Sequence, residues 1–326
     1  MYLPDFEVFE PKSIQEACSE LHRYREHGVG IIAGGTDFLV DIRPKIILQH
    51  LPRCQGCIDS GGTAREPKKC PPYVVSLSRI PEIRGIMEDG NHIRIGAMTT
   101  IRELCESALI KKELTALYDG ASQLGSPLVR NRGTLGGNIA NARPAADTFV
   151  ASVALNADLA IESVNGKRDI PVISFAKAPG VTMLTPIDII THLKFPVHHR
   201  STGSSYIKLV NRKSLEIAIV GIACMLVLDD HHEQIENARI AMGAVGPTPL
   251  LAQSAMGFLI GKPPRDEIFR EAAKLALKDA HAISDHRGSK HYREIEIEVL
   301  TLRSLQRAMS VAAMSKNMDN KKPSGK

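Results

Sequence analysis

Gly-Gly turns at residues 33–37 (AGGTD) and 134–138 (TLGGN) most constrain how this chain of 326 residues folds. The first follows the short apolar run at residues 30–33, so the backbone turns where a predicted buried strand ends. Glycine adopts positive φ at low cost and lets backbone N–H groups approach an anion closely, so each turn suits a phosphate site. A lone Gly-Gly pair can equally be an ordinary tight turn, and neither turn matches GxGxxG or a P-loop.

The composition is that of a folded globular chain, long enough for two domains. Hydrophobic residues make up 43% and charged residues 24% of the chain, which excludes a disordered or fibrous protein. Its 41 basic and 36 acidic residues are spread out, without the basic runs typical of nucleic-acid binding. The longest apolar run, residues 217–228, is far shorter than the roughly 20 residues that span a bilayer. With no signal pattern at the N-terminus, we expect a cytoplasmic protein without a membrane span or a nucleic-acid partner.

Capping patterns predict helices before both turns. Residues 13–16 (SIQE) form a capping box, and apolar residues at helical spacing follow until Gly28. A second box at residues 100–103 (TIRE) opens a further helix.

The second half of the chain is first strand-like and then helical. Strand-like stretches occur at residues 189–195, 206–210, 217–228 and 238–242. Two or three predicted helices follow between residues 249 and 310. Strands followed by helices are typical of a small antiparallel sheet with helices packed on one face. We therefore predict a first domain at residues 1–178, a second at residues 179–312 and a flexible tail at residues 313–326.

Five ordered blocks carry a family resemblance: the first glycine turn, residues 95–100 (IGAMTT), residues 132–140 (RGTLGGNIA) followed by Pro144 and Asp147, the pair Lys208 and Arg212, and residues 241–249 (AMGAVGPTP). They are similar to the AGGTDLL, IGAxTT, second-turn, KxxxR and ALGGVAPTP segments of one family. The chain thus resembles the FAD-binding medium subunit of the molybdenum hydroxylases, the family of carbon monoxide dehydrogenase and xanthine dehydrogenase. Glu216 departs from the pattern, because the family usually has Asp there.

The resemblance implies an α+β fold, with a two-part FAD-binding domain of the vanillyl-alcohol-oxidase (PCMH) type followed by a small antiparallel sheet with helices. It assigns no catalytic residue to this chain. The residues that it assigns to FAD are Ile32, Ala33, Gly34, Gly35, Thr36, Asp37, Gly125, Thr134, Gly137, Asn138, Asn141, Asp147, Ile190 and Lys208.

Among these residues, the resemblance implies that residues 32–37 wrap the pyrophosphate with backbone amides. Asp147 would accept hydrogen bonds from ribose hydroxyls. Ile190 and Lys208 would lie nearer the isoalloxazine, where the lysine can stabilise an anionic reduced flavin. Without the resemblance, Lys208 reads as a solvated strand residue.

The implied function is electron transfer. FAD would accept electrons from a small subunit carrying [2Fe–2S] clusters, which would receive them from the molybdopterin centre of a large subunit. The three subunits would assemble as a dimer of heterotrimers. An external acceptor would complete the route, and substrate chemistry would occur on the molybdopterin partner. A self-sufficient flavin oxidoreductase is the alternative, but it needs a substrate base that the sequence does not identify. A second alternative is a non-catalytic scaffold protein that binds a metal in its loop but no flavin. In that case both glycine turns would have a structural role only.

A cysteine-containing stretch at about residues 43–72 is interpreted as an insertion. His50, Cys54, Cys57 and Cys70 form H-x3-C-x2-C-x12-C, a set of four ligand-type side chains. We predict a [4Fe–4S] cluster there, with zinc as the alternative and a loop without metal left open. The family pattern does not contain this insertion at this place. The other cysteines, Cys18, Cys105 and Cys224, lie on apolar faces and are predicted to be structural thiols, with one of them as the alternative fourth ligand in place of His50.

Overall fold

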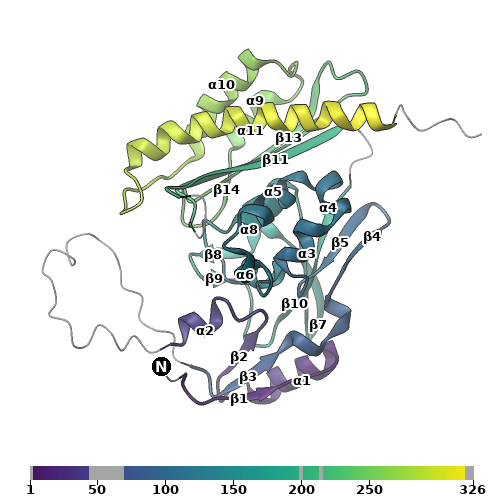
Figure 1. Cartoon of the computed structure of the whole chain (residues 1–326), viewed down its shortest axis with the longest axis vertical. Helices are drawn as coiled ribbons and strands as arrows, with labels where there is room; N and C mark the ends of the chain where they lie inside the picture. Colours follow the sequence, from purple (N-terminus) through teal and green to yellow (C-terminus); the bar gives the residue numbers. More distant parts are fainter. Residues whose placement is uncertain (1–2, 44–69, 198–200, 213–215, 320–326) are drawn as a thin grey trace, which may run out of the picture.

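The computed structural model describes residues 3–43, 70–197, 201–212 and 216–319 (Figure 1). From the N-terminal end upward in Figure 1, a small sheet with α1 and α2 is followed by a larger sheet with several helices, and then by the C-terminal sheet and its helices. Buried apolar side chains form three clusters, one of which joins the middle part to one face of the C-terminal sheet. Within the described ranges, no helix is long and apolar enough to cross a membrane.

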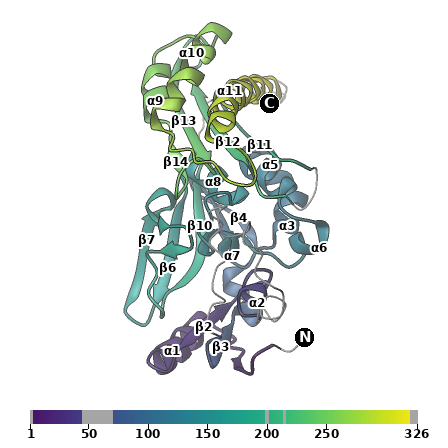
Figure 2. The same ribbon diagram turned by 90° about the vertical axis from the view of Figure 1, so that its left-hand side faces the viewer.

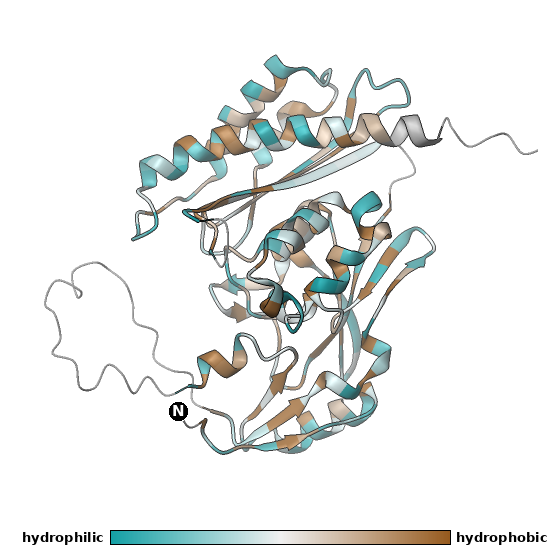
Figure 3. Cartoon of the chain, in the orientation of Figure 1, coloured by the Kyte–Doolittle hydropathy of each residue, from teal (hydrophilic) through white to brown (hydrophobic). Residues whose placement is uncertain are grey.

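The N-terminal part is a three-stranded parallel sheet in the order β1 (Glu7–Phe9), β3 (Tyr73–Ser76), β2 (Val29–Ile32). Helix α1 (Ile14–Tyr24) buries Ala17, Cys18 and Leu21, which recur at helical spacing. Its predicted cap is present, because Ser13 accepts a hydrogen bond from the Glu16 backbone N–H at 3.2 Å. Strand β2 ends at Ile32, directly before the first glycine turn, and α2 (Phe38–Asp41) follows that turn. Figure 3 shows α2 and these strands as largely hydrophobic.

The middle part is built on a five-stranded antiparallel sheet. Its order is β4 (Ile86–Asp89), β5 (His92–Gly96), β10 (Ile189–Pro196), β6 (Asp158–Ser163), β7 (Gly166–Pro171). The helices of this part are α3 (Ile101–Glu106), α4 (Ala108–Glu113), α5 (Thr115–Gln123), α6 (Pro127–Arg130), α7 (Leu135–Ala140) and α8 (Asp147–Ala154). A small hairpin joins β8 (Ala176–Ala178) to β9 (Val181–Thr182). The predicted capping box at Thr100 and Glu103 opens α3.

The C-terminal part is a four-stranded antiparallel sheet in the order β11 (Thr202–Leu209), β12 (Val220–Leu228), β13 (Ile235–Gly243), β14 (Leu250–Leu251). Helices α9 (Gln253–Leu259), α10 (Asp266–Ala276) and α11 (Lys290–Asp319) follow. Short 3₁₀ turns elsewhere lie at Leu77–Arg79, Pro81–Ile83, Val172–Ser174 and Leu277–Asp279.

Both faces of the C-terminal sheet are covered, whereas the sequence predicted helices on one face. Helices α9, α10 and α11 lie on one side, and α5 and α8 of the middle part lie on the other (Figure 1). Every residue of β12 is therefore buried. This accounts for its unbroken apolar run, because a strand buried on both faces does not alternate.

Two predicted boundaries differ from the structure. Strand β10 pairs with β5 and β6, and Leu193 stands opposite both Ile95 and Leu159, so this strand belongs to the middle sheet (Figure 2). The first domain thus extends through Pro196 instead of ending at residue 178. A strand's own sequence does not reveal which sheet it joins, which is why the prediction placed it in the second domain. Helix α11 continues through Asp319, past the expected start of a tail at residue 313.

Candidate functional site

A cavity of about 480 Å³ lies between the N-terminal sheet and the helices of the middle part. Its walls come from β2, both glycine turns, α2, residues around α6, and the segment that leads into β10. Parts of the chain that are far apart in sequence, such as Ala33 and Ile190, therefore line one space. Its size falls in the range of small-molecule and cofactor sites.

The cavity brings together most of the residues that the resemblance assigns to FAD. Those that line it are Ala33, Gly34, Gly35, Thr36, Asp37, Thr134, Gly137, Asn138, Asn141 and Ile190. Four predicted residues are not part of its lining: Ile32, Gly125, Asp147 and Lys208.

The two glycine turns touch each other. A Cβ atom at Gly34 would lie 1.9 Å from the backbone oxygen of Arg132, so only glycine permits this approach. Beside this contact, Asn141 Nδ2 donates a hydrogen bond to Asp37 Oδ1 at 2.8 Å. The turns therefore form one continuous wall of the cavity.

The first turn presents unused backbone donors. In the part of the chain that the structure describes, the backbone N–H groups of Gly34, Gly35 and Thr36 have no protein acceptor. Gly35 has φ +77°, a conformation that favours glycine. Backbone N–H groups require partners, and successive N–H groups in such a turn form a concave site for anions.

The second turn uses its donors within the protein. The N–H groups of Leu135 and Gly136 donate to the backbone oxygens of Thr99 at 3.0 Å and Ala97 at 2.8 Å. The Gly137 N–H donates to Thr134 Oγ1 at 3.1 Å. These bonds fasten the first turn of α7 onto residues 97–99, so the second turn acts as a wall.

Close packing explains the glycine at position 136, where a Cβ atom would lie 2.6 Å from the Cβ of Ala97.

Residues 95–100 form one of the family-like blocks, but no site role is predicted for them from the sequence. Ala97 and Met98 in fact line the cavity. The family-like block was a signal that could have identified them.

Other apolar and charged residues of the cavity wall were not predicted from the sequence. Leu124 and Val129 contribute apolar surface from either side of the Gly125 turn. Neither has a local signal that distinguishes it from an ordinary core residue.

A buried carboxylate, Asp188, also lines the cavity. Arg168 contacts both its oxygens, at 2.9 and 2.7 Å, and the Thr185 N–H and hydroxyl donate at 2.7 and 2.8 Å. Burial raises the pKa of Asp188, but the hydrogen bonds from Arg168 and Thr185 lower it by more than burial raises it. The pKa of Asp188 therefore lies below the usual range. Asp188 is therefore an ionised anchor for the segment before β10.

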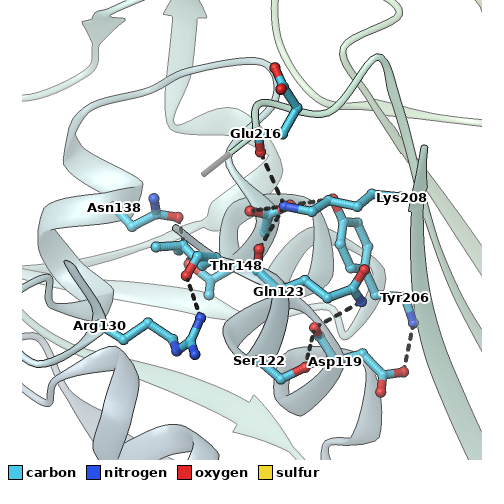
Figure 4. Close-up of polar contacts among 11 residues, drawn as sticks. Asp119, Ser122, Gln123, Arg130, Asn138, Thr148, Tyr206, Lys208 and Glu216 are labelled. Carbon is cyan, nitrogen blue, oxygen red and sulfur yellow. Dashed lines mark hydrogen bonds and ion pairs between the residues drawn. The ribbon is translucent and has the colours of Figure 1, made fainter. Parts of the chain in front are cut away.

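Lys208, which Figure 4 shows beside Tyr206, pairs with Asp147, and neither member of this pair lines the cavity. Lys208 Nζ is 3.1 Å from Asp147 Oδ2, and the two side chains are 5% and 9% exposed. The Tyr206 hydroxyl donates to Asp147 Oδ1 at 2.8 Å. In this structure the two residues pair with each other, and the direct contacts with FAD that the resemblance implies for them stay a prediction.

Most of the predicted metal ligands fall outside the described residues. This applies to His50, Cys54 and Cys57, whereas Cys70 is described and its Sγ lies 3.6 Å from the Pro71 oxygen. Within the described ranges, no cluster of three or more His, Cys, Asp or Glu side chains is arranged to hold a metal.

Two of the three remaining cysteines are buried, as predicted. Burial raises the pKa of Cys18 to about 11 and that of Cys224 to about 12, which makes both thiols inert. Cys105 is half-buried on α3.

Two family models match the chain in succession. Residues 53–198 match the FAD binding domain in molybdopterin dehydrogenase, and residues 205–308 match the CO dehydrogenase flavoprotein C-terminal domain. The junction between the two matches falls between β10 and β11, where the structure also divides the sheets. The first glycine turn precedes the first match.

Individual relatives cover nearly the whole chain. The carbon monoxide dehydrogenase medium chain of Hydrogenophaga pseudoflava is 30% identical over 313 residues, 96% of this chain and 100% of the relative. The xanthine dehydrogenase FAD-binding subunit of Escherichia coli is 29% identical over 285 residues, 86% of this chain and 89% of that subunit. Among solved structures, carbon monoxide dehydrogenase from Hydrogenophaga pseudoflava matches with a TM-score of 0.82 at 29% identity, covering 95% of this chain and 99% of that one.

These matches confirm the family and the α+β fold class predicted from the sequence. The chain belongs to the FAD-binding medium subunits of the molybdenum hydroxylases, of the carbon monoxide dehydrogenase and xanthine dehydrogenase type, and is a subunit of an FAD-dependent oxidoreductase.

Proposed function

We propose that this chain holds FAD in the cavity between the two glycine turns and passes electrons between a partner's iron–sulfur clusters and an external acceptor. The observation that carries the proposal is the first glycine turn. Its residues Gly34, Gly35 and Thr36, whose N–H groups have no acceptor among the described residues, line a cavity of cofactor size in a chain of this family.

The residues present fit the cofactor. The amides of Gly34, Gly35 and Thr36 suit a diphosphate, because backbone donors at a glycine turn bind anionic oxygens without a side chain between them. The apolar surface of Met98, Leu124, Val129 and Ile190 suits aromatic rings. Bound FAD supplies the redox chemistry.

The protein's own contribution is to hold and orient the cofactor. The contact between Gly34 and Arg132 and the hydrogen bond between Asn141 and Asp37 fix the distance between the turns. The ion pair of Asp188 with Arg168 fixes the segment that carries Ile189 and Ile190. Sites held by such supporting contacts bind with little reorganisation.

The proposed partners follow from the relatives, which are medium or FAD-binding subunits of larger enzymes. We infer a molybdopterin-binding large subunit, where the substrate is oxidised, and a small subunit with [2Fe–2S] clusters, assembled as a dimer of heterotrimers.

A separate cofactor proposal concerns the insertion. The ligand set His50, Cys54, Cys57 and Cys70 supports a [4Fe–4S] cluster, or zinc, on sequence grounds alone. Iron and sulfide analysis of anaerobically purified protein, with Cys57→Ser as the control, tests it. Less than one iron per chain in both proteins excludes the cluster.

The test of the main proposal uses the chain purified with its partners. We expect FAD at a stoichiometry near one per chain, and a flavin absorbance band that bleaches when the substrate of the large subunit is added. A chain that contains no flavin and takes up none on titration with FAD would refute the site. Turnover of an organic substrate by the isolated flavin-loaded chain would instead support a self-sufficient oxidoreductase.

A further inference from the structure

A β-bulge interrupts strand β10 at the wall of the cavity. Ile161 and Ala160 are consecutive on β6, and they stand opposite Ile190 and His192 of β10. Thr191 is therefore an extra residue of β10 that has no partner on β6. Such a bulge re-aims the side chains beside it and is common next to binding sites. Here it comes directly after Ile190, which lines the cavity.

The bulge allows Ile190 and Leu193 to point to the same side of the sheet. Both belong to one cluster of buried apolar side chains, whereas Ile189 belongs to the cluster of the N-terminal part. Side chains three residues apart on a regular strand point to opposite faces. Leu193 is fully buried opposite Ile95 and Leu159, so the core fixes its side. In a regular β10, Ile190 would therefore turn to the other face of the sheet.

Thr191 holds the bulge with both its side chain and its backbone. It is buried, and its Oγ1 donates to the Ala160 backbone oxygen at 3.3 Å and lies 3.0 Å from His192 Nδ1. A hydroxyl donates one proton and can also accept, so both bonds form together when Nδ1 carries a proton. On the other side of β10, the Ala97 N–H donates to the Thr191 backbone oxygen at 2.9 Å. Ala97 also lines the cavity, so the bulge fastens two of its wall residues.

We propose that Thr191 is a positioning residue, whose hydroxyl ties the bulge to β6 and thereby aims Ile190 at the flavin. This inference rests on the proposed function, because it takes FAD to be the occupant of the cavity. Thr191 is not among the residues that line the cavity. Its contribution to FAD binding therefore passes through Ile190.

The first experiment compares Thr191→Val and Thr191→Ser in the full chain by titration with FAD. Valine keeps the shape of threonine but has no hydroxyl, so it loses the bonds to Ala160 and His192. We expect the valine variant to bind FAD about fivefold more weakly, the equivalent of one hydrogen bond. Serine keeps the hydroxyl and should bind FAD within about twofold of the wild type.

A double-mutant cycle with Ile190 tests the route of the effect. Ile190→Ala removes apolar surface from the cavity wall and should weaken FAD binding about tenfold. If Thr191 acts by aiming Ile190, Thr191→Val should cause no further loss in the Ile190→Ala background. Independent effects of the two residues would instead multiply to about fiftyfold.

Thr301→Val is the matched control. Thr301 lies on α11, is fully buried, and its Oγ1 has no hydrogen-bond partner in the described part of the chain. It does not line the cavity. Valine there should leave the FAD dissociation constant unchanged and the unfolding temperature equal or higher, because no bond is lost.

The outcomes separate the proposal from the function on which it rests. A Thr191→Val variant that binds FAD as tightly as the wild type would overturn the proposal, and so would a full further loss in the Ile190→Ala background. A crystal structure of the valine variant with an intact bulge despite weakened binding would do the same. If Thr191→Val does not fold, Thr191→Ala takes its place with the same expectations. A wild-type chain that binds no FAD refutes the proposed function itself, and the inference with it.

Discussion

The two glycine turns look alike in sequence but serve the site in opposite ways. Among the described residues, the first turn leaves the N–H groups of Gly34, Gly35 and Thr36 without acceptors, whereas the second uses those of Leu135, Gly136 and Gly137 to bond to residues 97–99 and Thr134. One turn therefore offers donors to a ligand, and the other is a packed wall. The Gly-Gly pattern indicates that another group comes close to the backbone. The residues packed around each turn determine whether that group is a ligand or part of the protein.

Gly34→Ala is expected to have the largest effect, because it breaks the contact between the turns. The added methyl would lie 1.9 Å from the Arg132 backbone oxygen, so the turns must separate. We expect a loss of about 3 kcal/mol of unfolding free energy, the upper part of the overpacking range, together with flavin-free protein. Denaturant titration and the flavin-to-protein ratio measure both.

Gly35→Ala is the control for that prediction. Its φ of +77° strains alanine, but the atoms nearest to the methyl would belong to the side chains of Leu39 and Ile32, at 3.3 Å or more. A loss of about 1 kcal/mol is expected from the backbone strain. If both variants lose the same stability, contact between the turns is not what requires glycine at position 34.

Gly137→Val comes next and tests the second turn as a wall. A Cβ atom there would meet Thr134 Oγ1 at 2.9 Å and Ala33 Cβ at 3.7 Å, so a larger side chain projects between the turns. We expect roughly 1 kcal/mol of destabilisation but largely flavin-free protein, because the side chain blocks the diphosphate. Gly137→Ala should lose less FAD. Full flavin occupancy in the valine variant would show that the cofactor does not pass this turn.

Local features of the fold were predictable because they depend on neighbouring residues. The capping residues Ser13 and Thr100 begin helices as expected, and the strand-then-helix order of the second half is present. Strand β10 was placed in the wrong domain, because its partners β5 and β6 lie far away in sequence. Its own residues carry no mark of that pairing.

Most of the residues that the resemblance assigns to FAD lie around one cavity, and their contacts with FAD stay a prediction. The family resemblance named both turns, and the structure lines one cavity with them. It also named Asp147 and Lys208, but their mutual pairing depends on how the C-terminal sheet packs against α8. Leu124 could not be recognised as a cavity residue from the sequence. An apolar residue after a helix is usually part of the core, and only the folded structure shows that a cavity lies beside it.

Asn141→Ala is a smaller change that tests the link between the turns. It removes the 2.8 Å hydrogen bond to Asp37 and should cost about 1 kcal/mol of stability, the usual net value of one hydrogen bond. If the bond stabilises the FAD-bound protein by about 1 kcal/mol more than the free protein, its loss lowers FAD affinity about fivefold. Fluorescence titration of the flavin-free protein measures this.

Gln306→Ala provides the matched control for Asn141, since it removes an amide-to-carboxylate bond of 3.0 Å to Asp266 in the C-terminal domain. Stability should fall by a similar or smaller amount with no change in FAD affinity. Equal losses of affinity in both variants would mean that the link between the turns has no special part in binding.

Gly257→Ala is expected to have the smallest effect, and of opposite sign. Gly257 lies in helix α9, and a Cβ atom there would meet nothing within 4 Å. Neither reason for glycine found in the turns, close approach or positive φ, applies to it. Alanine should therefore raise the unfolding free energy by roughly 0.5 kcal/mol, because it restricts the unfolded chain, and leave FAD binding unchanged. A destabilised variant would show that α9 packs against a further surface at this position, as a partner subunit would provide.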